Sequence, residues 1–471
     1  MTQPAGNDPR IQPFVHTMRA ADMPEVAVNT FVHHLRRYLA GDQGTLGRDR
    51  IEPAPDLPDA DELGNVADLG AAALDRTVVL KLNGGLGTSM GLEKAKSLLE
   101  VREGLTFLDL ITRQARAMRE TTGADVPLLM MNSFRTADDT ERALASDTGL
   151  SVRGLPLGFR QHRVPKVLVD DGSPARCAAE PELEWCPPGH GDVYTALHTS
   201  GTLHALLAAG IELAFLSNAD NLGAVVDTSL LGYMVSEGLE FMMEVADRTP
   251  ADRKGGHLCR LRGDGLALRE SAQCPADEVG EFQDIRRYRY FNTNNLWVHL
   301  PSLARLLDEH GGVLPLATIV NHKTLDPRDP SSPAVVQLET AMGSAISLFD
   351  RAAAVRVPRR RFSPVKNTDD LLAVRSDAYR LTDDFRVVLA PGRTTPPTIQ
   401  LDASYYKLID DFESRFPYGA PSLIDCASLT VEGNVRFGAD VVVRGEALVR
   451  AGDEPAAIED GSVLIGVVDL G

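Results

Sequence analysis

The sequence has few cysteines and no long apolar run. Its five cysteines include no Cys-x-x-Cys pair, and their number is odd. This predicts free thiols in a reducing cytoplasm and argues against a disulfide framework or a zinc site. Because no apolar stretch reaches about 18 residues, we expect no membrane-spanning helix. Residues 1–13 are polar and interrupted by prolines, without the apolar core of a signal peptide.

Positive charge is outnumbered by negative charge, with 48 Lys and Arg against 66 Asp and Glu. The formal net charge of −18 argues against general nucleic-acid binding, which requires a basic face. A polyanion can still bind where arginines are concentrated, as at residues 286–289 and 359–361, although an exposed surface position is the better explanation for each single arginine. A length of 471 residues and a hydrophobic content of 43% predict a globular protein of about two or three domains.

Residues 78–96 carry the strongest functional pattern. The apolar run Val78–Leu82 predicts a buried strand. It leads directly into a glycine-rich stretch that ends in two lysines: Gly84, Gly85, Gly87, Gly91, Lys94 and Lys96. Glycines let backbone N–H groups approach a ligand closely, and lysines reach phosphate oxygens. The pattern is typical of a polyphosphate-binding loop, and a glycine-rich turn without a ligand is the weaker alternative.

The loop lacks two commoner phosphate-binding motifs. A P-loop ends in Gly-Lys-Ser/Thr, but here Gly91 is followed by Leu92. The dinucleotide fingerprint Gly-x-Gly-x-x-Gly fits at Gly85 and Gly87 but fails at Met90. A kinase, an ATPase and a dehydrogenase are therefore disfavoured.

Strand and helix patterns alternate from residue 77 onward. Strands are expected at 77–82, 126–131, 211–217, 240–245 and 295–299. One helix is expected to begin after Thr106, a good N-cap residue, and another to run from about Asp192 to Ala208. This alternation predicts a mainly parallel sheet with helices on both faces. Ligands bind beyond the carboxyl ends of such strands, so three loops should meet at one edge: 83–96, 132–135 and 218–223.

Two regions flank this alternating core. Residues 1–74 predict an N-terminal extension with one or two amphipathic helices and a surface linker at 47–64. Residues 391–397 break the pattern. Beyond them, large apolar residues recur every six positions, at Val431, Phe437, Val443 and Val449. This period predicts a few coils of parallel β-helix, with a small antiparallel sheet as the alternative. The predicted domains are 1–74, 75–390 and 398–471.

A stiff turn surrounds one histidine. Pro187–Pro188 restrict the chain, while Gly189 and Gly191 remove side-chain bulk around His190. A histidine at a helix N-terminus can donate to a phosphate oxygen, and we expect Asp192 to cap the helix that follows. An exposed histidine in a rigid turn is the alternative.

Three further segments carry polar side chains. An apolar strand ends at Ser217 and presents Asp220. A carboxylate there suits Mg²⁺, which takes one or two protein carboxylates and completes its shell with water and phosphates. The Asn-rich run 291–295 suits sugar hydroxyls, because an amide both donates and accepts. Lys366 follows an extended, Pro-containing stretch and can reach into a cleft. An ordinary turn residue, a plain Asn-rich turn and a surface lysine are the respective alternatives.

Together these segments resemble the eukaryotic-type UTP–glucose-1-phosphate uridylyltransferases, also called UDP-glucose pyrophosphorylases. The resemblance extends from Val78 to the C-terminus, and the N-terminal region carries little of it. The matching segments follow one order along the chain: Leu82–Gly91, Met131–Phe134, Pro187–Tyr194, Ser217–Gly223, Lys254–Gly256, Phe291–Trp297, Gln337–Thr340 and Pro364–Lys366. The resemblance implies an α/β, Rossmann-like nucleotidyltransferase fold, in which helices flank a mixed sheet and a parallel β-helix-like domain follows.

The resemblance also implies a reversible, Mg²⁺-dependent transfer of UMP from UTP to glucose 1-phosphate. By that match, the UTP phosphates are held by Leu82, Asn83, Gly84, Gly85 and Lys96. The uracil is bound by Met131, Gln161 and Gly189. The ribose and the metal lie near Asn218, Ala219 and Asp220, with Asp220 as the metal ligand. The phosphates at the reacting centre are engaged by Lys96, His190 and Lys366, and the glucose by Asn292, Thr293 and Asn294.

Two departures from the family pattern affect the loops. The usual Gly-Pro-Lys is Lys94-Ala95-Lys96, which keeps the lysine but not the rigid turn. The usual Asn-Ile-Asp has the smaller Ala219 at its centre. Neither change removes a charged group. A transferase for another sugar phosphate and a non-catalytic UDP-sugar-binding paralogue stay open as alternatives. The expected partners are the two small-molecule substrates, with no nucleic acid or membrane, and self-association through the C-terminal repeat is a further expectation.

Overall fold

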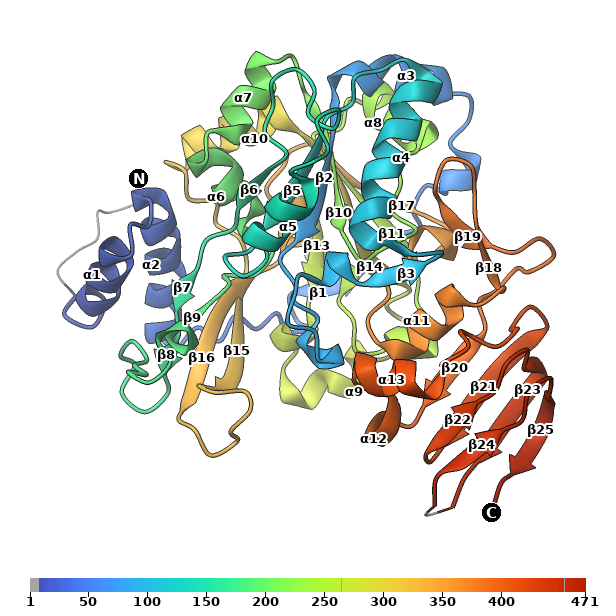
Figure 1. The fold of residues 1–471 in the computed structure, drawn as a ribbon. Coiled ribbons are helices and arrows are strands. Elements are labelled where there is room, and N and C mark those ends of the chain that lie inside the picture. Colours follow the sequence, from blue (N-terminus) through green and yellow to red (C-terminus); the bar gives the residue numbers. More distant parts are fainter. Residues whose placement is uncertain (1–7, 264, 453) are drawn as a thin grey trace.

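The centre of the computed structural model is a ten-stranded mixed sheet (Figure 1). The structure describes residues 8–263, 265–452 and 454–471. The strands of this sheet are β1 (Ile51–Pro53), β2 (Thr77–Asn83), β5 (Leu128–Asn132), β6 (Gly158–Arg160), β10 (Leu213–Asn218), β11 (Phe241–Asp247), β12 (His257–Leu261), β13 (Leu266–Arg269), β14 (Tyr290–His299) and β17 (Ala352–Arg356). Their order is β1-β12-β14-β10-β2-β5-β6, with β11, β13 and β17 pairing outside this path.

The strands β10, β2, β5 and β6 are parallel neighbours. In contrast, β14 runs antiparallel to both β10 and β11, and β12 runs antiparallel to β1, β13 and β14. The sheet is therefore mixed, and the mainly parallel sheet expected from the alternation is wrong. The predictions at 77–82, 126–131, 211–217 and 240–245 correspond to β2, β5, β10 and β11 and are confirmed. The strand predicted at 295–299 is longer, because it begins at Tyr290 and includes the Asn-rich run that sequence patterns alone treat as a turn.

Helices cover both faces of the sheet, as predicted. They are α3 (Ala67–Ala73), α4 (Phe107–Thr122) and α8 (Thr228–Ser236) on one face, and α6 (Asp192–Thr199), α7 (Thr202–Ala208) and α10 (Leu300–Glu309) on the other. Every residue of β2 is buried. Val78, Leu80 and Leu82 pack with the second group of helices, whereas Val79 packs with the first, because successive strand side chains point to opposite faces.

Two predictions about helix ends have different outcomes. Thr106 caps α4 in a capping box, since its Oγ1 accepts from the Asp109 N–H at 3.1 Å. The single helix predicted from Asp192 to Ala208 is wrong. Gly201 adopts φ +74° between α6 and α7 and interrupts the helical backbone. Asp192 is also not a cap, because it is the first residue of α6 and its carboxylate turns toward His162.

The N-terminal region packs against the rest of the chain and adds a strand to the central sheet. The amphipathic helices α1 (Gln12–Ala20) and α2 (Glu25–Leu39) form as predicted and pack against Val164, Trp185 and Val336. The segment 47–64 was predicted to be a surface linker, but its residues 51–53 form β1 and extend the central sheet beside β12. Ile51 is buried there against Cys259 and Tyr288, and this apolar contact explains the difference.

The C-terminal region consists of parallel strands, and the antiparallel alternative is excluded. One sheet has the order β20-β21-β23-β25, and a second pairs β22 with β24. Their bounds are β20 (Thr398–Leu401), β21 (Cys426–Glu432), β22 (Val435–Phe437), β23 (Val442–Arg450), β24 (Ala456–Ile458) and β25 (Val463–Asp469), with α12 (Ala403–Tyr406) and α13 (Ile409–Arg415) beside them. The four residues of the six-residue period, Val431, Phe437, Val443 and Val449, are buried in its core.

Smaller elements complete the described chain. They are α5 (Ala137–Leu144), α9 (Val279–Phe282), α11 (Thr368–Arg375), β3 (Glu100–Arg102), β4 (Leu105–Thr106), β7 (Val164–Pro165), β8 (Val167–Leu168), β9 (Trp185–Cys186), β15 (Thr318–Thr324), β16 (Ala334–Thr340), β18 (Tyr379–Leu381) and β19 (Val387–Leu389). All five cysteines are free, as predicted. Within the described ranges, each helix is too short or too polar to span a membrane.

Candidate active site

A cleft of about 350 Å³ opens where β2, β5 and β10 end. These strands are parallel neighbours, so their carboxyl ends meet at one edge of the sheet, as predicted. The cleft collects most of the residues expected at the site: Leu82, Asn83, Gly84, Gly85, Lys96, Met131, Gln161, Gly189, His190, Asn218, Ala219 and Asp220. Ser97 and Pro187 also line it. Sequence analysis missed Ser97, although it directly follows Lys96. Its hydroxyl finds no hydrogen-bond partner among the described residues.

The glycine-rich loop is anchored at both ends. At its start, the buried Asn83 side chain donates to Asn132 Oδ1 and to Thr140 Oγ1, both at 2.8 Å. Near its end, the backbone N–H of Lys96 donates to the carbonyl of Gly85 at 3.0 Å. The Asn83 side chain therefore anchors the start of the loop. Both of its N–H donors are engaged, so neither is free for a ligand in this geometry.

Lys96 and Asp220 form the charged pair of the cleft. Lys96 Nζ lies 2.6 Å from Asp220 Oδ2, and the two side chains are 15% and 26% exposed. The pair joins the end of the glycine-rich loop to the end of β10. It keeps both charges accessible to a ligand while they neutralise each other, and an anion or a cation entering the cleft would compete for one partner.

His190 is a neutral donor in this geometry. Its Nδ1 accepts a hydrogen bond from the Met342 N–H at 3.0 Å, so the ring proton is on Nε2. Burial lowers the pKa of His190 to about 4. The ring therefore carries no charge at neutral pH, and it offers one N–H to an oxygen in the cleft.

The turn before α6 is clamped from two sides. Gln161 Nε2 donates to the carbonyl of Gly189 at 2.8 Å, and the Thr340 N–H donates to the carbonyl of Pro188 at 2.9 Å. Gly189 has φ +80°, and a Cβ there would lie 2.4 Å from the Thr340 carbonyl oxygen. Only glycine fits this position.

A buried histidine–aspartate pair supports Gln161 and was missed by sequence analysis. The His162 backbone N–H donates to Asp192 Oδ2 at 2.8 Å, and its ring Nδ1 lies 2.9 Å from Asp192 Oδ1. Asp192 thereby fixes the position of residue 161 relative to the start of α6. The adjacency of His162 to Gln161 is the one clue that the sequence contains.

The Asn-rich run lies in a β-bulge of β14 outside the residues that line the cleft. Glu244 and Val245 of β11 pair with Asn295 and Asn292, and this leaves residues 293–294 between them unpaired. Such bulges redirect side chains. Asn292 Nδ2 donates to Asn294 Oδ1 at 2.8 Å. Thr293 is turned inward, is 1% exposed, and donates to the Glu244 carbonyl at 2.7 Å.

Lys366 is exposed and also lies outside the residues that line the cleft. It remains tied to the site, because the neighbouring Val365 N–H donates to the Asp220 carbonyl at 3.1 Å. Its Nζ lies 5.6 Å from the centre of the Phe362 ring.

Glu270 is a candidate site residue that sequence analysis missed. Burial raises its pKa to about 7, and its Oε2 would lie 2.5 Å from a Cβ placed on Gly256. The carbonyl of Gly256 accepts from the Asn292 N–H at 3.4 Å. A carboxyl group thus stands beside the segment that is hydrogen-bonded to the Asn-rich bulge, with no local motif around it in the sequence.

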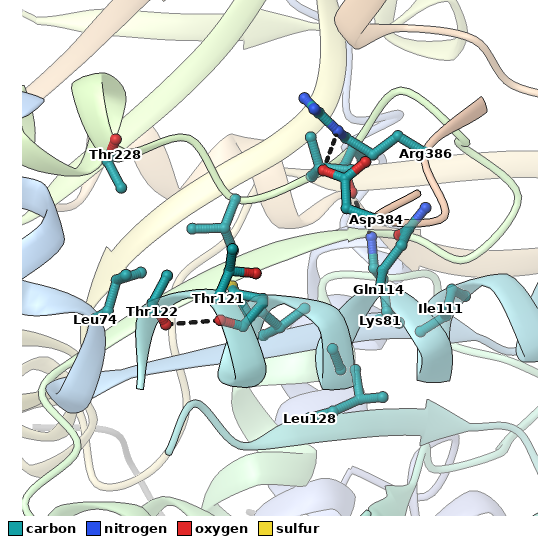
Figure 2. A pocket seen from close by; sticks show the side chains of 16 residues that line it. Leu74, Lys81, Ile111, Gln114, Thr121, Thr122, Leu128, Thr228, Asp384 and Arg386 are labelled. Carbon is teal, nitrogen blue, oxygen red and sulfur yellow. Dashed lines mark hydrogen bonds and ion pairs between the residues drawn. The ribbon is translucent and has the colours of Figure 1, made fainter. Parts of the chain in front are cut away.

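A second cavity lies on the face of the sheet that α4 covers. It measures about 260 Å³ and lies between α4, β2 and the 224–228 segment, with Arg386 at its rim (Figure 2). Its walls are mostly apolar. Lys81 Nζ, at its edge, donates to Ser217 Oγ at 2.8 Å and to the Ala224 carbonyl at 2.7 Å. The Lys81 side chain therefore links β2 to β10 and to the 224–228 segment. The polar groups suited to phosphate chemistry lie in the cleft and not in this cavity.

The fold and the cleft together define a class. A Rossmann-like mixed sheet, a glycine-rich loop beyond its central strand and a lysine–aspartate pair facing that loop make this protein a nucleotidyltransferase. The family model described as UTP–glucose-1-phosphate uridylyltransferase matches residues 28–444. The chain belongs to this family.

Individual relatives agree with this assignment. The UTP–glucose-1-phosphate uridylyltransferase of Saccharomyces cerevisiae is 42% identical over 453 residues, which cover 95% of this chain and 89% of that protein. The one from Solanum tuberosum is 42% identical over 445 residues, covering 92% and 90%. Both matches include nearly the whole chain, so the family resemblance extends further toward the N-terminus than the motifs indicated.

Solved structures have the same fold. The UDP-glucose pyrophosphorylase of Leishmania major, known in open and closed structures, matches with a TM-score of 0.91 and 42% identity, covering 98% of this chain and 100% of that one. The Trypanosoma brucei protein matches with a TM-score of 0.90 and 45% identity, covering 98% and 100%. A variant of the Leishmania major enzyme in complex with UDP-glucose matches with a TM-score of 0.91 and 43% identity, with the same coverage.

Replacing Gly189 tests the clamped turn. Gly189→Ala places a Cβ against the Thr340 carbonyl, which displaces the turn that carries His190 and that Gln161 holds through the Gly189 carbonyl. We expect UTP to bind at least about 10-fold more weakly, measured by titration calorimetry, since a displaced binding group loses much of its contribution. Gly210→Ala is the matched control, because Gly210 has φ +79° but no atom within 4 Å of its Cβ position. Equal UTP affinity in both variants would refute the prediction.

Proposed function

We propose that this chain transfers UMP from UTP to glucose 1-phosphate, producing UDP-glucose and pyrophosphate in a reversible, Mg²⁺-dependent reaction. The observation that carries the proposal is the Lys96–Asp220 pair facing the glycine-rich loop at the carboxyl ends of β2 and β10. Membership of the uridylyltransferase family supports the substrates. The five free thiols support a reducing, cytoplasmic location.

The chemistry needs positioning and charge stabilisation more than proton transfer. A phosphate oxygen of glucose 1-phosphate attacks the α-phosphorus of UTP, and the bond from that phosphorus to the bridging oxygen breaks, releasing pyrophosphate. The nucleophile is already an anion, so no general base is required. The obstacle is to bring two anions together in line, which lysines and oriented N–H groups overcome.

The residues of the cleft suit this task. We assign the UTP phosphates to the backbone of residues 82–85 and to Lys96, and the uracil to Met131, Gln161 and Gly189. His190 would donate its Nε2 proton to a phosphate oxygen, because its Nδ1 is occupied by Met342. Lys366 would reach the reacting phosphates from the segment bound to the Asp220 loop.

The ribose and the glucose occupy the remaining positions. Asn218 and Ala219 end β10 beside Asp220 and would border the ribose. For the glucose hydroxyls we assign Asn292 and Asn294, with Thr293 shaping their bulge through its bond to the Glu244 carbonyl.

Asp220 fits a divalent ion that is shared with the substrate. In the described ranges, no group of three or more His, Cys, Asp or Glu side chains could hold a metal by itself. Mg²⁺ needs only one or two protein carboxylates when phosphates and water complete its shell. Asp220 has one oxygen engaged by Lys96 and would serve as that ligand. When bound, the ion would neutralise charge on the phosphates.

The activity test also separates the alternatives. Purified chain is incubated with UTP, Mg²⁺ and a panel of sugar 1-phosphates, and pyrophosphate release is measured. We expect release with UTP and glucose 1-phosphate, and none with other nucleotides. Broad release across the sugars would identify a general UDP-sugar pyrophosphorylase. Binding of UDP-glucose without any release would refute catalysis and favour a regulatory paralogue.

Removing either lysine tests the assigned roles. Lys96→Ala and Lys366→Ala should each lower turnover at least ~100-fold, the effect of losing one preorganised transition-state donor. Steady-state rates of pyrophosphate release measure it. Lys94→Ala is the matched control, because Lys94 is exposed on the same loop and should leave turnover near the wild-type value. Near-normal turnover in both test variants would contradict the roles.

Self-association through the C-terminal sheet is a further proposal. Val463, Ile465 and Val467 on the terminal strand β25 are 53%, 65% and 66% exposed. An apolar edge strand favours pairing with another chain. Light scattering should give a multiple of 50.9 kDa for the wild type and the single-chain mass for Ile465→Lys. A wild-type chain at 50.9 kDa would contradict the proposal.

A further inference from the structure

A glutamate on β11 and an arginine bound to the Asp220 loop form a buried ion pair. Glu244 is 0% and Arg361 6% exposed. Arg361 Nε lies 2.7 Å from Glu244 Oε2, and Arg361 Nη2 lies 2.7 Å from Glu244 Oε1. This two-pronged geometry is the strongest that an arginine and a carboxylate form. The sequence placed Arg361 in a basic run that is better explained as surface, and the buried position corrects that prediction.

Each member of the pair holds further polar groups in place. Glu244 Oε1 also accepts from Trp297 Nε1, and Oε2 from Asn295 Nδ2, both at 2.9 Å. Its backbone carbonyl accepts from Thr293 in the β14 bulge. Arg361 Nη2 also donates to the Val225 carbonyl at 2.9 Å. The carboxylate therefore contacts the strand of the proposed glucose-binding asparagines, and the arginine contacts the chain after Asp220.

The segment that follows Arg361 is bound directly to the Asp220 loop. Asn221 Nδ2 donates to the Arg361 carbonyl at 3.2 Å, and its Oδ1 accepts from the Ser363 N–H at 2.9 Å. The Leu222 N–H donates to the Ser363 carbonyl at 3.2 Å, and the Val365 N–H donates to the Asp220 carbonyl at 3.1 Å. Lys366 is the next residue. The short segment 362–365 therefore connects the buried pair to Lys366 and is itself hydrogen-bonded to the Asp220 loop.

We propose that the Glu244–Arg361 pair is a positioning device that sets Lys366 relative to Asp220 for the reaction. Neither residue lines the cleft, so both act through other groups. The inference rests on the proposed roles of Lys366 and Asp220. Two charged groups must hold one geometry around a phosphate, and a displacement of about 1 Å lowers a rate about 100-fold. The bidentate pair and its satisfied neighbours supply that rigidity from within the core.

A purely structural role would give a different result. The buried pair Arg269–Glu278, with side chains 0% and 8% exposed, lies outside the residues that line the cleft. It serves as the control, because Glu278→Gln removes the same charge from another buried arginine–glutamate pair. We expect Glu278→Gln to lower thermal stability and to leave the turnover of the folded protein near wild type.

The test is a double-mutant cycle with Lys366. Glu244→Gln keeps the shape of the side chain but removes its charge, and should lower kcat about 10- to 100-fold with little change in KM for UTP. In the Lys366→Ala background the same change should have almost no effect, because the lysine that it positions is absent. Arg361→Lys, which retains the charge but loses the fork, should give an intermediate kcat. All rates are divided by the folded fraction from thermal melts.

The outcomes distinguish a failure of this inference from a failure of the proposed function. Equal losses of kcat from Glu244→Gln in both backgrounds, or a loss matched by Glu278→Gln, would refute positioning of Lys366. If Glu244→Gln does not fold, Arg361→Lys in the same cycle decides the question. An active wild type with an unaffected Glu244→Gln variant refutes this inference alone, whereas an inactive wild type refutes the proposed function and this inference with it.

Discussion

The parallel pairing of β10, β2 and β5 is the constraint on which the rest of this structure depends. Parallel strands have their carboxyl ends at one edge of a sheet, so pairing alone brings the glycine-rich loop, Met131 and Asp220 together. Helices on both faces bury these strands, apart from Asn218 at the end of β10. The site is therefore a consequence of sheet topology, and loop details refine a location that the backbone has already determined.

The proposed function requires an acidic protein to bind polyanions, and the local arrangement of the cleft suits this. The net charge is −18, yet the cleft presents Lys96, the neutral ring of His190 and the N–H groups of a glycine-rich loop. The lowered pKa of His190, caused by burial, leaves a hydrogen-bond donor that needs no charge. Lys96 is balanced by Asp220. Under the proposed roles, such a cleft is nearly neutral before substrate arrives, and a substrate phosphate would compete for Lys96 while a metal ion would compete for Asp220.

Behind the cleft, buried charges are fully engaged with partners. Glu244 and Arg361 satisfy each other, and the Lys81 amino group, whose pKa burial lowers to about 7, donates to two oxygen acceptors. Buried ions are expensive unless they are paired and hydrogen-bonded, and they often add less stability than apolar residues of similar size. Their presence directly behind the loops is consistent with a need for defined geometry at the site.

Local patterns in the sequence determined β2, β5, β10, β11 and the end of β14, the glycine-rich loop, the six-residue period of the C-terminal sheet and the segments that converge on the cleft. Strand period, glycine content and motif order act over short distances, so they can be read without the fold. Only the tertiary structure decided that Arg361 is buried, that β14 bulges opposite Glu244 and that Asp192 binds His162 instead of capping its helix. Those features arise from contacts between segments distant in the chain, and no local spacing encodes them.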